Sequence, residues 1–350
     1  MKIMRVGGSV RDELLKSFHP YMDVQTHDRD YVMIDATITD IEQLTAKGFR
    51  EVGSSFPGVY LHPVTADQYC IPRSTRSGYN QLIDDLMKRD LTCNAIAVED
   101  DGRYVDPFNG MKDIKDGILR HVSKHFADDP VRVLRIGRFV ARFGFDVADE
   151  TIEMIDHLRD NGELDHLQPD RVILELTKGI MEKFPQSMIT FMYDNSLICH
   201  AFTKYALIMV DNLLPLSKAA HADEDLHVRL AVALCDFWKR MTDADLRRFT
   251  RTFNIPKVVQ RALEIVHTYN EQLHNYHDLD INQRLAFIRS SRRIGQRTEL
   301  INIIDKVLVY HGYSDIVDMI NSDVDAVKSV EIVEGMSSEQ IKNLQLAAFK

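Results

Sequence analysis

The pattern of apolar residues changes character about one third of the way along the chain. Up to residue 122, short apolar runs alternate with turns, which is typical of β-strands. The runs that predict strands are 3–6, 31–35, 49–52, 58–62, 68–71, 94–98 and 103–105. Helical spacing predicts helices over 9–17 and 39–47, whereas residues 72–90 lack clear strand character.

From about residue 127 the apolar positions follow helical spacing instead. The first such stripe begins at Val131 and continues through Phe143. Further helices are predicted over 149–160, 169–183, 185–195, 199–211, 223–241, 243–253, 256–275, 281–290, 296–311, 313–320, 322–330 and 337–348. The expected fold class is α+β, with an N-terminal head of mixed sheet and helices followed by an elongated all-α body.

A Gly-Gly pair near the N-terminus joins a strand pattern to a helix pattern. Gly7 and Gly8 follow the first apolar run, and Val10, Leu14 and Leu15 form the apolar face of the helix that comes next. Glycine lets a ligand approach the backbone closely, and the start of a helix is electropositive. This arrangement suits a phosphate group, although a Gly-Gly pair before a helix also serves as a simple tight turn.

Two aspartates at i, i+2 open the next strand. Asp28 and Asp30 would project from the same face of a strand, about 7 Å apart along the backbone. Two carboxylates on one face repel unless a cation lies between them, and Mg²⁺ with open positions for phosphate oxygens is the usual solution. A solvated strand edge is the simpler alternative. Together with the Gly-Gly pair and Arg11, the aspartates favour metal-assisted phosphoryl or nucleotidyl transfer.

Composition limits the remaining possibilities. The 350 residues are 45% hydrophobic and 27% charged, an ordinary globular composition with room for two or three domains. The net charge of −10 disfavours general binding to polyanions. Local basic clusters at 132–142, 247–251 and 284–297 nevertheless leave nucleic acid binding open. No run is long enough to span a bilayer, and the first residues do not form a signal-peptide pattern.

The four cysteines are scattered through the chain and form no C-x-x-C pair. They are Cys70, Cys93, Cys199 and Cys235. Reduced thiols and a cytoplasmic location are therefore expected.

Five motifs, in order, resemble those of class II tRNA nucleotidyltransferases, the CCA-adding enzyme family of the polymerase β-like superfamily. The family patterns are G-G-x-V-R-D, D-x-D, R-D-x-T-x-N-A-x-A, D-x-x-x-G and E/D-D-x-x-R. Matching segments begin at Gly7, Asp28, Arg89, Asp106 and Asp128. The match covers about 195 residues closely and the helical remainder more loosely. It implies a polymerase β-like nucleotidyltransferase head that adds CMP and AMP from CTP and ATP to the tRNA 3′ end.

The resemblance also implies roles for individual residues. Asp28 and Asp30 would hold two Mg²⁺ ions in an in-line nucleotidyl transfer. The triphosphate would lie against Gly7, Gly8, Ser9 and Arg11. Arg89, Asp90 and Asn94 offer a donor, an acceptor and an amide for a ribose.

Base selection would fall to the start of the helix that follows. Asp129 and Arg132 would form a protein template that accepts cytosine or adenine, and Arg135 would assist. The simpler interpretation is a helical ion pair. Arg138 and Arg142 suit either RNA phosphates or ion pairs. The basic cluster that contains Arg289, Arg292 and Arg293 suits either tRNA phosphates or a solvated helical face.

Two departures from the family pattern bear on function. About ten residues are missing after Ser77-Gly78-Tyr79, in a loop that the family uses to switch from C to A, so an enzyme that adds only CC is an alternative. Some bacterial relatives carry a helical H-D phosphohydrolase domain. Here Cys235 replaces the expected histidine and leaves Asp236 isolated, so we expect no hydrolase function.

The interpretation divides the chain into a catalytic head over 1–122, a helical base-recognition neck over 123–195 and a helical tRNA-binding body over 196–350. The oligomeric state stays open, and no membrane partner is expected. Besides a CC-adding enzyme, the alternatives are a poly(A) polymerase, which shares this head, and an inactive RNA-binding protein.

Overall fold

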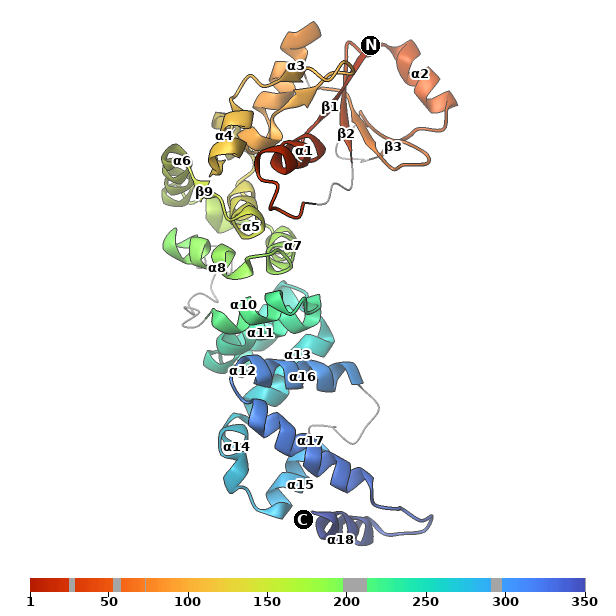
Figure 1. The fold of residues 1–350 in the computed structure, drawn as a ribbon, viewed down its shortest axis with the longest axis vertical. Coiled ribbons are helices and arrows are strands. Elements are labelled where there is room, and N and C mark those ends of the chain that lie inside the picture. Colours follow the sequence, from red (N-terminus) through yellow and green to blue (C-terminus); the bar gives the residue numbers. More distant parts are fainter. Residues whose placement is uncertain (25–28, 53–57, 73, 198–212, 291–297, 350) are drawn as a thin grey trace. The chain divides into compact units, whose positions relative to one another are not determined.

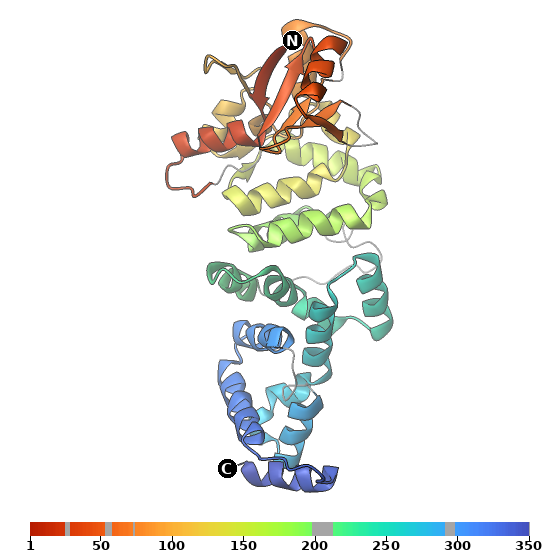
Figure 2. The ribbon, with the colours of Figure 1, turned by 90° about the vertical axis from the view of Figure 1, so that its right-hand side faces the viewer.

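The computed structural model of the chain describes residues 1–24, 29–52, 58–72, 74–197, 213–290 and 298–349. The chain divides into two compact units, Met1–Leu167 and Gln168–Lys350. The first is a mixed sheet with helices, and the described part of the second is helical (Figures 1 and 2). The expected α+β fold class is therefore confirmed. The functional boundaries expected after residues 122 and 195 stay a prediction.

A seven-stranded sheet organises the first unit. Its order is β3-β4-β5-β2-β1-β6-β7, and only the β2–β5 pair is parallel. The strands are β1 (Lys2–Val6), β2 (Asp30–Ile34), β3 (Arg50–Val52), β4 (Val59–Leu61), β5 (Gln68–Cys70), β6 (Ala97–Val98) and β7 (Tyr104–Val105). In the β1–β2 ladder Val6 lies opposite Asp30. This register places the first residue of β2 beside the Gly-Gly turn that ends β1.

Alternating side chains bury both faces of the sheet. On one face Val6 and Val32 pack against Leu82 and Leu86 of α3 (Gly78–Met87). On the other face Met33 packs in a cluster with Leu44 of α2 (Ile38–Ala46). Strands buried on both faces explain why their sequences are apolar runs with little alternation.

Short elements connect the sheet to the rest of the first unit. They are α1 (Gly8–Phe18), the 3₁₀ turn η1 (Thr92–Asn94), α4 (Gly110–Asp116), η2 (Lys124–Asp128), α5 (Arg132–Phe143), α6 (Asp149–Asp160) and η3 (Glu163–His166). The two-residue strands β8 (Ile118–Leu119) and β9 (Asp146–Val147) form a separate parallel pair.

The described part of the second unit is built from helices, and α11 lies at its centre. Its helices are α7 (Pro169–Ile180), α8 (Pro185–Asp194), α10 (Leu214–His221), α11 (Leu226–Arg240), α12 (Asp243–Thr252), α13 (Lys257–Thr268), α14 (Asn270–His274), the 3₁₀ turn η5 (Tyr276–Asp278), α15 (Ile281–Ser290), α16 (Thr298–Tyr310), α17 (Ser314–Lys328) and α18 (Ser338–Ala348). Helix α11 packs against α7, α10, α13 and α16 and buries Leu230 and Trp238.

Several local predictions differ from the structure. The segment 94–98 is not one strand, because η1 ends at Asn94 and β6 begins at Ala97. Helices α3, α4 and α10 were not predicted, since their first residues carry turn-forming Gly or Pro. The helices predicted over 313–320 and 322–330 are one helix, α17. Polar residues at 321–323 suggested a break, but buried Ile320 and Val324 continue the apolar stripe across them.

A close backbone contact fixes the turn at η1. A Cβ atom on Gly110, at the start of α4, would lie 2.1 Å from the carbonyl oxygen of Thr92. The Thr92 hydroxyl donates to Asp113 of the same helix at 2.7 Å. Only glycine at residue 110 allows α4 to approach the turn this closely.

We therefore expect Gly110→Ala to destabilise the first unit by about 1–3 kcal/mol, as overpacking does elsewhere, because the Thr92 backbone must move. Urea unfolding followed by circular dichroism measures the change. Lys115→Ala is the control, since it changes an exposed residue of the same helix. Equal losses in the two variants would contradict the explanation.

Candidate active site

A cavity of about 460 Å³ opens in the first unit, where β1, β2, η1 and α5 meet. The residues that line it are Gly7, Gly8, Arg11, Asp30, Lys88, Arg89, Asp90, Asn94, Asp129, Arg132, Arg135, Arg138, Phe139 and Arg142. Four of the five sequence motifs contribute to this lining. Seven lining side chains are basic and three are carboxylates, in a protein whose net charge is −10. The cavity therefore attracts anions although the chain as a whole is acidic.

The Gly-Gly turn forms one wall of the cavity. Gly7 has a φ of +75° and immediately precedes α1, whose first turn carries no acidic side chain and no side-chain cap. A Cβ on Gly7 would lie 2.7 Å from Nη1 of Arg89 and 3.3 Å from Oδ2 of Asp30. The start of the helix thus presents its electropositive end beside a cation and a carboxylate.

Asp30 is the first residue of β2 and borders the same wall. Its place follows from the β1–β2 ladder, in which it lies opposite Val6. The other predicted metal ligand, Asp28, lies outside the described residues, so the expected i, i+2 pair stays a prediction.

A largely buried chain of polar contacts forms part of the cavity wall. Arg11 is only 5% exposed, and its Nε donates to Asp12 at 2.8 Å. Nη1 of Arg11 donates to Oδ1 of Asn94 at 2.6 Å. The amide of Asn94 donates in turn to Oδ1 of Asp90 at 2.8 Å. Arg135 of α5 closes one end by donating to Oδ2 of Asp90 at 3.0 Å.

The other end of this buried chain also reaches α5. Nη2 of Arg142 lies 3.4 Å from Oδ2 of Asp12. Two arginines of α5, at 135 and 142, therefore hold the carboxylates that flank the Arg11–Asn94 hydrogen bond. These contacts link the first and third sequence motifs to α5 through side chains.

The environment of Asp90 keeps its carboxylate charged. Burial acts to raise the pKa of Asp90, but the Arg135 charge and the hydrogen bonds from Asn94, the Leu91 amide and Arg135 lower it overall. Hydrogen bonds donated to the carboxylate favour its charged form.

Arg132 is held by two backbone carbonyls at the start of α5. Nη1 donates to the carbonyl of His125 at 2.5 Å, and Nη2 donates to that of Lys88 at 2.7 Å. Asp129 lies just before the helix, and its carbonyl accepts from the Arg132 amide at 3.0 Å. Both side chains line the cavity, so the predicted i, i+3 pair is brought to one place.

The other residues that the sequence assigned to nucleotide or RNA binding do not all lie at the cavity. Ser9 is buried and does not line the cavity. Arg138 and Arg142 do line it. Arg289 is distant in the chain and donates to Gln345 of α18 at 3.1 Å. Arg292 and Arg293 lie outside the described residues.

Two lining residues, Lys88 and Phe139, were not assigned to the site from the sequence. Lys88 caps the end of α3 directly before the Arg89-Asp90 motif. Phe139 lies seven residues after Arg132 and so shares its helix face, a spacing that identifies it in retrospect. The Phe139 ring is 5.3 Å from Cζ of Arg11 and 4.8 Å from Cζ of Arg138. The ring thus makes cation–π contacts with two of the guanidinium groups that line the cavity.

The sequence of the chain is similar to one known head domain and to several named bacterial proteins. Residues 3–120 match the poly(A) polymerase head domain. A multifunctional CCA protein of Acinetobacter baumannii is 37% identical over 276 residues, which cover 70% of this chain and 64% of the relative. The multifunctional CCA protein of Nitrosomonas europaea is 41% identical over 249 residues, covering 66% of this chain and 57% of the relative. The chain thus spans less than two thirds of the length of these relatives.

Solved structures agree at the level of the fold. A CCA-adding enzyme in complex with CTP has a TM-score of 0.74 at 19% identity, over 98% of this chain and 85% of that one. A Thermotoga maritima CCA-adding enzyme complexed with tRNA has a TM-score of 0.73 at 21% identity, over 98% and 85%. The resemblance expected from the motifs is confirmed: the chain carries a poly(A) polymerase head domain and is a relative of the bacterial multifunctional CCA proteins.

Proposed function

We propose that this protein is a tRNA nucleotidyltransferase that adds CMP, and AMP where it completes the CCA end, to the tRNA 3′ end without a nucleic acid template. The observation that supports this proposal best is that the Gly-Gly turn, Asp30, the 89–94 motif and the Asp129–Arg132 pair meet in one basic cavity. The similarity to multifunctional CCA proteins supports the same activity.

The triphosphate would lie against the start of α1. Backbone N–H groups at Gly8 and the cations Arg89 and Lys88 border this part of the cavity. Arg11 is already engaged by Asp12 and Asn94, so its contribution is a fixed positive charge near the phosphates.

The donor set beside this wall fits a hard divalent cation. Asp30 presents a carboxylate 3.3 Å from the Cβ position of Gly7, where a phosphate would approach. With Asp28, it would hold Mg²⁺, which prefers carboxylate and phosphate oxygens. When bound, the ions supply charge neutralisation at the α-phosphate and lower the pKa of the attacking 3′-hydroxyl. The chain's own contribution is to align CTP and the RNA end with these carboxylates.

The buried polar chain would set the sugar position. Asp90 and Asn94 both line the cavity while bonded to each other. Because each is fixed by a second partner, Arg135 or Arg11, neither can rotate to accommodate a different ligand. Such preorganised polar groups favour a ribose with its 2′-hydroxyl over a deoxyribose.

Base selection would follow from the rigidity of Arg132. Two carbonyls hold its guanidinium, and Asp129 lies three residues earlier, just before α5. The Asp129 carboxylate accepts from the exocyclic amine of cytosine or adenine, whereas uracil and guanine would leave buried polar groups unpaired.

One observation favours the narrower, CC-adding activity. Nε of Arg76 donates to Asp84 of α3 at 2.8 Å, and the Gly78 amide donates to Asp35 at 2.9 Å. The short segment before α3 is therefore attached to the head at two points. In the family, a longer loop here accompanies the switch to A, so this short, attached segment favours an enzyme that stops after CC.

A cytoplasmic location suits this activity. Cys70, Cys93 and Cys235 are free thiols, and Cys199 lies outside the described residues. Among the helices that the structure describes, none has both the length and the apolar character needed to cross a membrane.

The proposal predicts a defined product length. Incubated with tRNA transcripts ending without a tail, in C or in CC, and with each nucleotide separately, the protein adds C until CC is complete. Addition of one A then identifies a CCA-adding enzyme. If no A is added, the protein is a CC-adding enzyme, and if a long A tract is added, it is a poly(A) polymerase. Gel analysis of labelled tRNA measures each outcome. In the same assay, Asp30→Ala should lower the rate of nucleotide incorporation by about 10²- to 10³-fold or more. No incorporation by the native protein would favour an inactive RNA-binding protein.

A second prediction concerns the template pair. Arg132→Lys keeps the charge but loses the forked donors, so the preference for CTP over UTP should fall by about 10- to 100-fold. Single-nucleotide incorporation with each nucleotide measures the ratio. Arg142→Lys, in the same cavity but paired with Asp12, should lower both rates without changing their ratio. Unchanged discrimination in Arg132→Lys would exclude the template role.

A third prediction concerns the ionised Asp90. Asp90→Asn should lower the free energy of unfolding by about 1.5–3 kcal/mol at neutral pH, the range for hydrogen bonds to charged groups. Because the folded-state pKa of Asp90 lies below its ordinary value of 3.8, this stabilisation is complete above pH 3.8 and is lost as pH falls through the folded-state pKa. Urea unfolding of the native protein and of Asp90→Asn measures this at neutral pH and at increasingly acidic pH, as long as the native protein stays folded. The difference between their free energies of unfolding should shrink as the pH falls.

The control for this third prediction is Asp100→Asn, which alters an exposed aspartate of the same unit. It should leave stability within experimental error at every pH. A difference between native protein and Asp90→Asn that does not depend on pH would contradict the assigned role of the carboxylate charge.

A further inference from the structure

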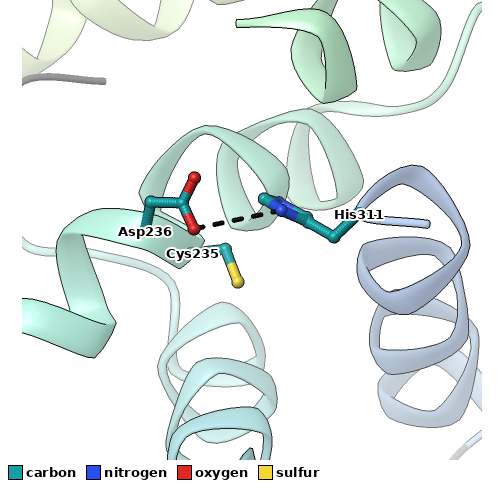
Figure 3. A group of neighbouring side chains, drawn as sticks. All are labelled: Cys235, Asp236 and His311. Carbon is teal, nitrogen blue, oxygen red and sulfur yellow. Dashed lines mark ion pairs between the residues drawn. The ribbon is translucent and has the colours of Figure 1, made fainter. Parts of the chain in front are cut away.

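Three side chains with metal-binding atoms meet in the second unit, far from the cavity in sequence. Cys235 and Asp236 are neighbours on α11, and His311 directly follows α16 (Figure 3). One ligand atom from each lies within 4.8 Å of the other two. The expectation from the sequence that Asp236 is isolated is therefore wrong.

We propose that Cys235, Asp236 and His311 form a zinc site that joins α11 to α16. The donor set is one sulfur, one imidazole nitrogen and one carboxylate oxygen, which suits Zn²⁺ rather than Mg²⁺. Three protein ligands leave a fourth tetrahedral position for water. Zinc binding at this site is independent of the proposed nucleotidyl transfer.

The orientation of His311 supports the assignment. Its Nε2 lies 3.4 Å from the carbonyl oxygen of Val232, one turn before Asp236. Donation by Nε2–H to this carbonyl leaves Nδ1 without a proton, and Nδ1 lies 4.0 Å from Oδ1 of Asp236. Histidines that bind metals are commonly held this way, with the second ring nitrogen donating to a backbone carbonyl.

The surroundings exclude water from part of the site. Cys235 is 2% exposed, and the side chain of His311 is 9% exposed. Asp236 is more open, at 24%, and gives the site a route to solvent. Coordination by Cys235 forms the Zn–S bond and releases the thiol proton to solvent.

Lys239 is the competing cation. Its Nζ lies 3.4 Å from Oδ1 of Asp236, one turn along α11. The same oxygen lies nearest Nδ1 of His311, so Lys239 competes with zinc for Asp236. Removal of the lysine charge should therefore strengthen metal binding, which distinguishes a metal site from a simple Lys–Asp–His ion cluster.

Cobalt substitution provides the test, because Co²⁺ bound to a thiolate gives a ligand-to-metal charge-transfer band in the near ultraviolet. The full chain, freed of metal by chelation, should bind one equivalent of Co²⁺ with this band, and one equivalent of Zn²⁺ should displace it. Cys235→Ser should abolish the band, and His311→Gln should weaken binding at least tenfold. Lys239→Gln should tighten it.

The matched control is His227→Gln. His227 also joins α11 to α16, through a contact of 2.9 Å between its Nδ1 and Glu299, but no cysteine is involved. This variant should bind Co²⁺ as the native protein does. Circular dichroism of each variant reports whether the helices persist, and His311→Gln keeps the test available if Cys235→Ser fails to fold.

The outcome separates this site from the proposed active site. Asp28 and Asp30 supply no sulfur, so metal bound there gives no charge-transfer band. Incorporation of CMP should continue in folded Cys235→Ser. Absence of the band in the native chain, or a band that is unchanged in Cys235→Ser, would overturn the zinc site and leave the proposed nucleotidyl transfer unaffected.

Discussion

The hydrogen bond from Arg11 to Asn94 is the contact on which the candidate active site depends. It joins the helix after the Gly-Gly turn to the 89–94 motif across 83 residues of sequence. Arg11 could not be buried without a partner, because placing an unpaired guanidinium inside a protein costs free energy. Asp12 and Asp90 neutralise and bind the two ends, and α5 supplies the arginines that neutralise those aspartates in turn. The cavity is thus formed by side chains that already satisfy one another.

This arrangement explains how an acidic chain forms a basic cavity. Backbone carbonyls and buried carboxylates hold the basic side chains that line the cavity. Their positions therefore do not depend on the net charge of the protein surface. Arg132 is held by two carbonyls, Arg135 by Asp90 and Arg142 by Asp12. Electrostatic attraction over a few ångströms depends on these local positions, since solvent and salt screen the more distant acidic residues.

Much of this could be predicted from the sequence, for identifiable reasons. Gly7, Asp30 and Asp90 fall in motifs whose order is characteristic of the family, and strands buried on both faces gave clear apolar runs. The partners of Arg11 could not be predicted, because a hydrogen bond to Asn94 depends on how α1 packs against η1. The cluster around Asp236 was missed because His311 is 75 residues away in the chain, and only the packing of α16 on α11 brings it near. Helix α3 was missed because its starting residues favour turns.

The pairing of Val6 with Asp30 has a consequence for how the protein tolerates change. The position of Asp30 is set by the hydrogen-bond ladder between β1 and β2 and not by the length of the connection between α1 and β2. Residues can therefore be added or lost between His19 and Val24 while the carboxylate stays beside the Gly-Gly turn. A single residue gained within either strand has the opposite effect, because side chains alternate between the two faces of a sheet and Asp30 would turn toward the face covered by α2. Related chains should accordingly differ in length at this connection while the two strands keep their lengths.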